Sequence, residues 1–341
     1  MQIVRWLLSP LGWMYGLVVG IRNAAYNRAW FDSKRGDLPT LVIGNIDVGG
    51  TGKTPHTQYF ARALSELQPA ILSRGYGRST KGYRRVYPES TSAECGDEPL
   101  LYASMPDGFP VAVCENRLVG IERLANETDS GCVILDDALQ HRRLEPDATV
   151  ALIRYGHWPW DASYLPSGDL RDHRSRLRQV DAIVVSHSPH PHPSPKKEEE
   201  RRRIRQRLRL PDQLPIAFSR MVYSPLRGMA TGEMAYPKKA LVVTGIARPQ
   251  ALIEYLKTVP VEVVHRAYRD HRNFTHTDLV DWTNDLETYG CSHIITTAKD
   301  AMRIRSVDGW NRLPICIQDI EVELDDNGAI VELIKVRLSS D

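Results

Sequence analysis

The chain has 341 residues, a formal net charge of +2 and 25% charged residues, a composition that suits a globular protein of one or two domains. The near-neutral charge gives no electrostatic case for a nucleic-acid partner. The cysteines are odd in number and lack metal-site spacing, which favours reduced, mostly buried thiols in a reducing compartment. They are Cys95, Cys114, Cys132, Cys291 and Cys316.

An uncharged apolar segment lies near the N-terminus, between Arg5 and Arg22. It is shorter than the roughly 20 residues that a membrane-spanning helix needs. Its tryptophans and tyrosine among aliphatic residues, flanked by arginines, favour a helix that lies in a membrane interface. An ordinary core helix, a membrane span and a signal peptide are the alternatives, although no small-residue cleavage site is evident. We predict an interfacial membrane helix over residues 1–24.

Apolar runs then alternate with helical patterns. A strand is expected at Thr40–Ile46 and a helix from Pro55 to about Leu67. Further strands are expected at Ala70–Ser73, Pro110–Cys114, Cys132–Leu135, Thr149–Ile153 and Ala182–Ser186, with a helix at Arg117–Asn126. The alternation predicts a mostly parallel sheet covered by helices on both faces. We assign residues 25–215 to this α/β domain, and the glycine-rich turn at residues 49–54 between its first strand and helix predicts that the domain is P-loop NTPase-like.

The composition changes near residue 188. The proline-rich stretch Ser188–Pro195 predicts a linker; its His-Pro alternation could bind a metal, but a linker needs none. Lys196–Arg209 predicts a solvated helix with internal charge pairs. Beyond it we expect strands at Ile216–Tyr223, Ala240–Thr244, Val261–His265, His293–Thr297, Pro314–Ile317 and Ala329–Val336, and helices at Gln250–Thr258 and Thr277–Tyr289. These elements predict a second, smaller α/β domain over residues 216–341.

A glycine-rich turn joins the first predicted strand to its helix. We call residues 49–54 the glycine loop; they are Gly49, Gly50, Thr51, Gly52, Lys53 and Thr54. A glycine-rich turn between strand and helix is typical of phosphate-binding loops, whose backbone N–H groups point at phosphate oxygens. Lys53 is expected to neutralise the β- and γ-phosphates, and Thr54 to offer its hydroxyl to Mg²⁺. The strict pattern begins with glycine, where this chain has Asp47.

Carboxylates follow apolar runs at positions suited to chemistry. Asp136 and Asp137 come directly after the strand predicted at Cys132–Leu135. Carboxyl ends of strands face the crevice in which α/β sheets bind ligands, so the pair is expected to hold the metal. Asp97 could accept a proton from a substrate hydroxyl, and a turn or N-cap role explains it as well.

Four motifs taken together resemble the tetraacyldisaccharide 4′-kinase family. In chain order they are Gly44–Pro55, Ser73-Arg74-Gly75-Tyr76, Gly96-Asp97-Glu98-Pro99 and Asp136–Leu144. The resemblance extends from the apolar N-terminal segment to Asp270-His271, and the family's own loop, Gly-Asn-x-x-x-Gly-Gly-x-Gly-Lys-Thr-Pro, accommodates Asp47.

The resemblance implies a reaction and a location. ATP, with Mg²⁺, would phosphorylate the 4′-hydroxyl of a tetraacyl glucosamine disaccharide 1-phosphate and form lipid IVA in lipid A biosynthesis. The enzyme would be peripheral or monotopic on the cytoplasmic face of the bacterial inner membrane. That location explains an apolar N-terminus on a kinase, and no nucleic acid or obligate protein partner is implied.

The resemblance also implies residue roles. Catalytic roles are expected for Asp97, His271 and Lys53; metal contacts for Thr54, Asp136, Asp137 and Asp172; and substrate contacts for Tyr76, Arg117, Gln140, His141 and Arg171. Asp97 would take the acceptor's proton, and His271 would close over the site from the second domain. Two positions depart from the family: Ala138 replaces a glycine, and Asp172 replaces a glutamate, which shortens its reach to a metal.

Two other functions compete with the kinase. A GTPase or metallochaperone-type switch would need a guanine-reading motif, and Thr297-Ala298-Lys299-Asp300 resembles one incompletely. A membrane-associated nucleotide binder without catalysis is the second. A comparison of ATP with GTP would separate the kinase from the GTPase-type switch. Transfer of label from ATP to lipid would exclude the nucleotide binder without catalysis.

Overall fold

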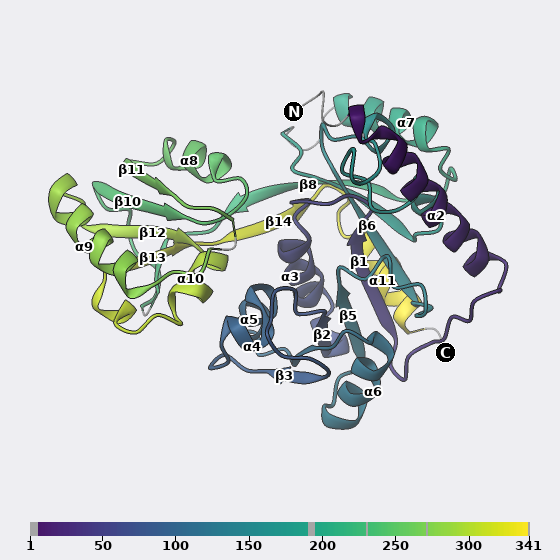
Figure 1. The fold of residues 1–341 in the computed structure, drawn as a ribbon, viewed down its shortest axis with the longest axis horizontal. Coiled ribbons are helices and arrows are strands. Elements are labelled where there is room, and N and C mark those ends of the chain that lie inside the picture. Colours follow the sequence, from purple (N-terminus) through teal and green to yellow (C-terminus); the bar gives the residue numbers. More distant parts are fainter. Residues whose placement is uncertain (1–5, 190–194, 230, 271, 340–341) are drawn as a thin grey trace.

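The protein consists of two lobes joined by a pair of long strands (Figure 1). The structure is a computed structural model, and it describes residues 6–189, 195–229, 231–270 and 272–339. The large lobe contains a nine-stranded sheet in the order β14-β8-β7-β6-β1-β5-β2-β4-β3, and the small lobe a five-stranded sheet in the order β11-β10-β12-β13-β9.

The large sheet is mostly parallel, as predicted. Neighbouring strands from β8 to β4 pair in parallel, and the edge strands β14 and β3 are antiparallel. Its strands are β1 (Thr40–Asn45), β2 (Pro69–Ser73), β3 (Arg84–Val86), β4 (Val111–Val113), β5 (Cys132–Asp136), β6 (Ala148–Arg154), β7 (Ala182–Ser186), β8 (Ile216–Tyr223) and β14 (Ile320–Leu324).

Helices cover both faces of this sheet because the central strands are apolar on both sides. In β1, Leu41 and Ile43 pack in one core cluster with Phe60 and Ile334, while Val42 packs in the other. The first face carries α3 (Lys53–Ala63), α5 (Asp97–Ala103) and α11 (Ala329–Leu338), and the second carries α6 (Arg117–Glu127) and α7 (Pro195–Leu208). The short α4 (Ser92–Cys95) precedes α5.

The small lobe repeats the α/β arrangement on a smaller scale. Its strands are parallel except for β9, and they are β9 (Arg227–Gly228), β10 (Lys239–Thr244), β11 (Glu262–Ala267), β12 (His293–Thr297) and β13 (Ile315–Gln318). Its helices are α8 (Gln250–Leu256), α9 (His276–Tyr289) and α10 (Ala298–Ile304). Helix α9 begins at a capping box between Thr275 and Asp278 and ends at Gly290, which has a left-handed φ of 63°.

The prediction of a strand at Ala329–Val336 is wrong, because this segment forms α11. Its buried residues Ile330, Val331, Ile334 and Leu338 follow the spacing of one helix face. The Asp326 carboxylate accepts hydrogen bonds from the N–H groups of Gly328 (3.2 Å) and Ile330 (2.8 Å), which stabilises the start of the helix.

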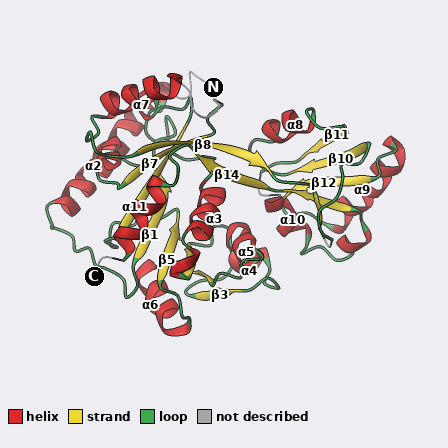
Figure 2. Ribbon diagram, turned by 180° about the vertical axis from the view of Figure 1, so that it is seen from behind, coloured by secondary structure: helices red, strands yellow, loops and turns green. Residues whose placement is uncertain are grey.

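The boundary between the two sheets does not lie at residue 216, where the second domain was predicted to begin. Strand β8 lies in the large sheet beside β7, and β14 returns from the small lobe to pair with β8. Figure 2 shows the two strands crossing between the lobes. Because α11 then packs on β1 and β6, both the N-terminal and C-terminal parts of the chain build the large lobe.

Helix α2 (Ser9–Asn27) lies on the large lobe and exposes an apolar face. Its exposed large apolar residues are Leu11, Trp13, Met14, Leu17, Val18 and Ile21. Gly12 and Gly16 face the protein, and a Cβ atom at Gly16 would lie 2.6 Å from the Tyr164 ring, so the close approach requires glycine. No helix among the described residues is long and apolar enough to cross a membrane.

Two further predictions concern the linker and the thiols. The His-Pro stretch falls largely on residues 190–194, which lie outside the described part of the chain. The cysteines are free and buried, as predicted.

Candidate active site

The glycine loop lies between the end of β1 and the start of α3. Gly49 and Gly52 have φ angles of 119° and 80°, a conformation that residues with side chains rarely adopt. The Thr51 hydroxyl accepts a hydrogen bond from Asn45 Nδ2 at 2.9 Å. The strand end therefore holds the loop, whose backbone leads directly into the positive N-terminus of a helix.

Lys53 brings its charge to the end of β5. Its Nζ lies 3.7 Å from Asp137 Oδ2 and donates to Asn45 Oδ1 at 3.4 Å. The predicted phosphate-binding cation and one predicted metal carboxylate thus meet at the carboxyl edge of the sheet.

Asp137 is held by Arg171 as well as by Lys53. Arg171 Nη1 donates to Asp137 Oδ2 at 3.0 Å, and its Nη2 contacts the other carboxylate oxygen and Asn45. Burial pushes the pKa of Asp137 upward, but the hydrogen bonds from Arg171 and the charge of Lys53 outweigh it and hold the pKa below its usual value. Asp137 is thus an ionised group with cationic partners already in place.

Asp136 has the opposite electrostatic environment. It is 2% exposed, and its Oδ1 has no hydrogen-bond partner among the described residues. Burial, followed by the nearby charges of Glu98 and Asp137, raises its pKa to about 7. A buried carboxylate oxygen without a donor is rare, and a cation beside it would satisfy it and restore the ionised form.

Glu98 joins these groups, although it was not among the predicted site residues. Thr54 Oγ1 donates to Glu98 Oε1 at 3.4 Å, and Lys299 Nζ donates to the same oxygen at 3.2 Å. Its place beside Asp97 in the Gly-Asp-Glu-Pro motif was the signal that could have identified it. The described residues contain no group of three His, Cys, Asp or Glu side chains arranged to hold a metal. Mg²⁺ at nucleotide sites is held by one or two carboxylates together with phosphates and water, so the oxygen groups of Thr54 and Asp136 suit it.

Asp97 is the first residue of α5, directly after Gly96, whose φ is 93°. Its Oδ2 lies 3.4 Å from Arg303 Nε, which comes from α10 of the small lobe. His271, the residue predicted to close over the site, lies outside the described residues.

Asp172 is engaged by the N-terminal helix. It is 1% exposed, and its Oδ1 accepts hydrogen bonds from Asn23 Nδ2 and from the His173 N–H, both at 2.7 Å. Its Oδ2 is buried, and no residue in the described part of the chain forms a hydrogen bond with it. The hydrogen bond from Asn23 therefore connects this predicted metal residue to α2.

The predicted substrate residues are only partly brought together. Gln140 Nε2 donates to Asn45 O at 2.8 Å, so Gln140 and Arg171 meet at Asn45. Arg117 is buried, donates to the carbonyl groups of residues 114 and 115, and has its pKa lowered by burial. Tyr76 is 78% exposed on a loop.

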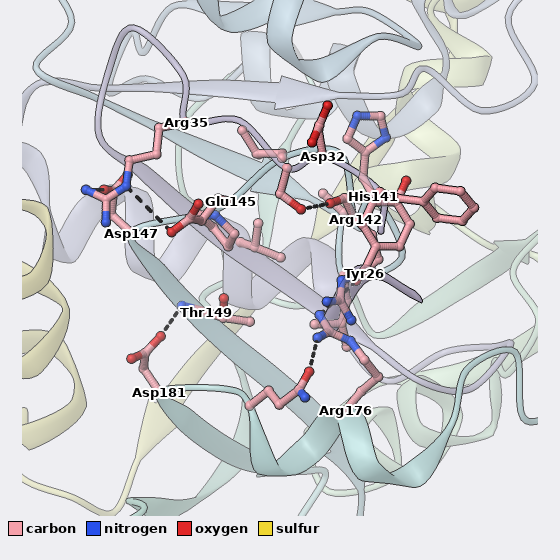
Figure 3. A pocket seen from close by; sticks show the side chains of 18 of the residues that line it. Tyr26, Asp32, Arg35, His141, Arg142, Glu145, Asp147, Thr149, Arg176 and Asp181 are labelled. Carbon is pink, nitrogen blue, oxygen red and sulfur yellow. Dashed lines mark hydrogen bonds and ion pairs between the residues drawn. The ribbon is translucent and has the colours of Figure 1, made fainter. Parts of the chain in front are cut away.

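His141 lines a pocket of about 750 Å³ beside the C-terminal end of α2 (Figure 3). Tyr26, Arg142 and Arg176 also line it, and the described residues of the glycine loop do not. Burial, followed by the charge of Arg117, lowers the pKa of His141 to about 4. Within the part of the chain that the structure describes, its buried Nε2 has no hydrogen-bond partner. His141 is therefore a neutral ring in a pocket lined by both arginines and carboxylates.

The incomplete guanine-type motif is occupied by internal contacts. Asp300 is fully buried and accepts hydrogen bonds from the Gly245 N–H (3.1 Å), from Thr297 Oγ1 (2.7 Å) and from Arg303 (2.7 Å). Lys299 is bound to Glu98 of the large lobe, so Asp300 is engaged within the small lobe and Lys299 in the contact between the lobes.

Comparison with known proteins agrees with this geometry. A family model described as Tetraacyldisaccharide-1-P 4′-kinase matches residues 4–339. The tetraacyldisaccharide 4′-kinase of Cytophaga hutchinsonii is 35% identical over 93% of this chain and 92% of its own length. The tetraacyldisaccharide 4′-kinase of Bacteroides thetaiotaomicron is 34% identical over 89% of this chain and 83% of its own length.

A solved structure has the same fold. LpxK from Aquifex aeolicus, in complex with ATP, superposes with a TM-score of 0.78, with 98% of this chain and 99% of that chain covered, at 23% identity. Identity that low supports the fold, whereas the family model and the curated relatives carry the assignment. The chain belongs to the tetraacyldisaccharide-1-P 4′-kinase family.

Proposed function

We propose that this protein is an ATP-dependent kinase that phosphorylates the 4′-hydroxyl of a tetraacyl glucosamine disaccharide 1-phosphate, forming lipid IVA. The observation that carries the proposal is the meeting of Lys53, at the start of α3, with Asp137, at the end of β5, 3.7 Å apart. This pair supports phosphate binding and metal binding at one edge of the sheet, in a chain of a kinase family.

The glycine loop binds the triphosphate in this proposal. Its N–H groups and the α3 N-terminus face the phosphates, and Lys53 exchanges its contact with Asp137 for phosphate oxygens. Arg171 keeps Asp137 paired during that exchange, because it already donates two hydrogen bonds to that carboxylate.

Thr54 and Asp136 would hold Mg²⁺, with Asp137 and Glu98 beside them. The ion would neutralise charge on the phosphate oxygens during transfer. The orphaned Asp136 oxygen supports this assignment, while a metal role for Asp172 is less well supported by its contacts with α2.

Asp97 orients the 4′-hydroxyl and accepts its proton. Phosphoryl transfer asks the protein chiefly for positioning and charge stabilisation, so the placement of this carboxylate matters more than its basicity. His271 is proposed to approach from the small lobe and exclude water, as the family resemblance implies. Tyr76, Arg117, Gln140, His141 and Arg171 remain the proposed contacts to the acceptor.

The exposed apolar face of α2 attaches the enzyme to the cytoplasmic face of the inner membrane in this proposal. Trp13 and Leu17 are 76% and 64% exposed on it. Tryptophan and aliphatic residues on one face of a helix partition into the membrane interface, where a lipid acceptor also lies.

The test is a transfer assay with labelled ATP and tetraacyl disaccharide 1-phosphate in mixed micelles, followed by mass spectrometry of the lipid. We expect one added phosphate on the non-reducing sugar and no transfer by a Lys53→Ala variant. Replacement of ATP by GTP should reduce the rate. Hydrolysis of nucleotide without phosphorylated lipid, or a preference for GTP, would contradict the proposal.

A further inference from the structure

A buried arginine of the small lobe contacts the carboxylate proposed to accept the proton. Arg303 Nε lies 3.4 Å from Asp97 Oδ2, with the two side chains 1% and 13% exposed. We propose that Arg303 is a positioning residue that orients the Asp97 carboxylate, and that it does so only while α10 lies on α5. This inference rests on the proposed role of Asp97.

Arg303 is held rigidly from its own lobe. Its guanidinium donates to Asp300 Oδ1 at 2.7 Å, to Gly245 O at 3.0 Å and to Arg272 O at 3.2 Å, and it lies over the Phe274 ring at 5.8 Å. A planar guanidinium with several of its donors engaged has little freedom left. The Nε edge that reaches Asp97 is therefore fixed relative to the small sheet.

A second ion pair fixes α10 relative to α5. Lys299 Nζ donates to Glu98 Oε1 at 3.2 Å, one residue after Asp97, and that same oxygen accepts from Thr54 of the glycine loop. Lys299 and Arg303 lie one helical turn apart and so reach neighbouring residues of α5. The two ion pairs together fix both the rotation of α10 about its axis and its position along α5, the helix that carries Asp97.

The pair depends on how the lobes are placed. Arg303 follows β12 of the small sheet, whereas Asp97 stands on a helix packed against the large sheet. Separation of the lobes would remove the Arg303 cation from the Asp97 carboxylate. Misplacement of a catalytic group by about 1 Å can cost on the order of 100-fold in rate, so a lost contact of this kind should appear in kcat.

The experiment uses the full-length chain with Arg303→Met, Arg303→Lys and Arg305→Met. Arg305 is an exposed arginine at the end of the same helix and provides a matched control. We expect Arg303→Met to lower kcat on the order of 100-fold with KM for ATP changed less than threefold. Arg303→Lys should recover part of the loss because it keeps the charge, and Arg305→Met should behave as wild type.

A double variant separates positioning from a general effect on folding. In an Asp97→Asn background, whose residual transfer is measured with labelled ATP over long incubations, Arg303→Met should change kcat less than threefold. If the two losses instead multiply, or if folded Arg303→Met keeps a kcat within threefold of Arg305→Met, the inference is overturned.

Thermal unfolding of the same variants provides a measurement that needs no acceptor lipid. The Tm shift of the double variant Asp97→Asn with Arg303→Met should be smaller than the sum of the two single-variant shifts, because each substitution removes the same ion pair. A wild-type chain that transfers no phosphate would refute the proposed function alone. Additive Tm shifts would refute the Asp97–Arg303 pair whatever the activity.

Discussion

Asn23 of the apolar helix α2 donates from Nδ2 to Oδ1 of Asp172 at 2.7 Å, and both side chains are buried. The Asp172 N–H in turn donates to Ile46 O at 3.2 Å, next to the end of β1. A helix with an exposed apolar face is thus linked by two hydrogen bonds to the end of the strand that leads into the glycine loop.

Replacing Asn23 by alanine should destabilise the protein. The buried Asp172 Oδ1 would lose its side-chain donor, which typically costs about 1–3 kcal/mol in free energy of unfolding. Urea unfolding measures the change. Asn126→Ala, which removes a surface hydrogen bond on α6, is the control and should shift the midpoint little. An Asn23→Ala protein as stable as wild type would show that the contact contributes nothing.

Charged residues on the apolar face of α2 should release the protein from lipid. Trp13→Glu together with Leu17→Glu removes two exposed apolar side chains, each of which contributes up to about 2 kcal/mol when buried. Co-sedimentation with vesicles should fall at least tenfold, while turnover on detergent-dispersed acceptor should change much less.

The control for this change is Val280→Glu on α9, an equally polar substitution at a residue that is 46% exposed. Removal of residues 1–24 should also impair activity on membrane-presented lipid, but it deletes Asn23 as well. Vesicle binding that survives both the double substitution and the deletion would rule out α2 as the anchor.

Asp97→Ala should lower turnover and spare nucleotide binding. General-base groups contribute on the order of 10²- to 10⁴-fold, so kcat should fall by that amount. The affinity for ATP, measured by equilibrium binding, should stay within about threefold because Asp97 lies on α5 rather than in the glycine loop. Equal losses in turnover and in ATP affinity would place Asp97 in nucleotide binding instead.

We expect the free energy of unfolding to fall in weak acid because of the buried residue His56. The ring is buried behind the glycine loop, with Nδ1 2.7 Å from Gly52 O and Nε2 2.8 Å from Ser219 Oγ. Burial lowers its pKa to about 4. Since the unfolded chain binds a proton near pH 6.5 and the folded protein does not, the stabilisation is present above pH 6.5 and is lost as the pH falls toward 4.

Between pH 7 and pH 5 the loss attributable to His56 should be about 2 kcal/mol in free energy of unfolding. Urea unfolding at the two pH values measures it, and His56→Gln is the reference because glutamine does not titrate in this range. The variant should be less stable at pH 7 but should lose less stability on acidification. Equal pH dependence in both proteins would contradict a buried neutral His56.

Local sequence was sufficient for much of the large lobe. The strands at Thr40–Asn45 and Cys132–Asp136 are short apolar runs that end in polar residues, and both appear where they were predicted. The strand prediction at Ala329–Val336 failed because a short apolar run does not distinguish a strand from a helix by its periodicity. Packing against β1 and β6 selects the helix over Ala329–Leu338. Glu98 was overlooked because its partner Lys299 is 201 residues away.

The glycine loop, the carboxylates that end β5 and the apolar N-terminal helix were determined by the sequence itself. Each is a local feature, in which backbone freedom, charge or hydrophobicity is concentrated within a few residues. Only the tertiary structure decided that Arg303 meets Asp97, that Asn23 binds Asp172 and that β14 returns to the large sheet. These contacts join segments that are distant along the chain, and their energy depends on packing and burial that no local pattern records.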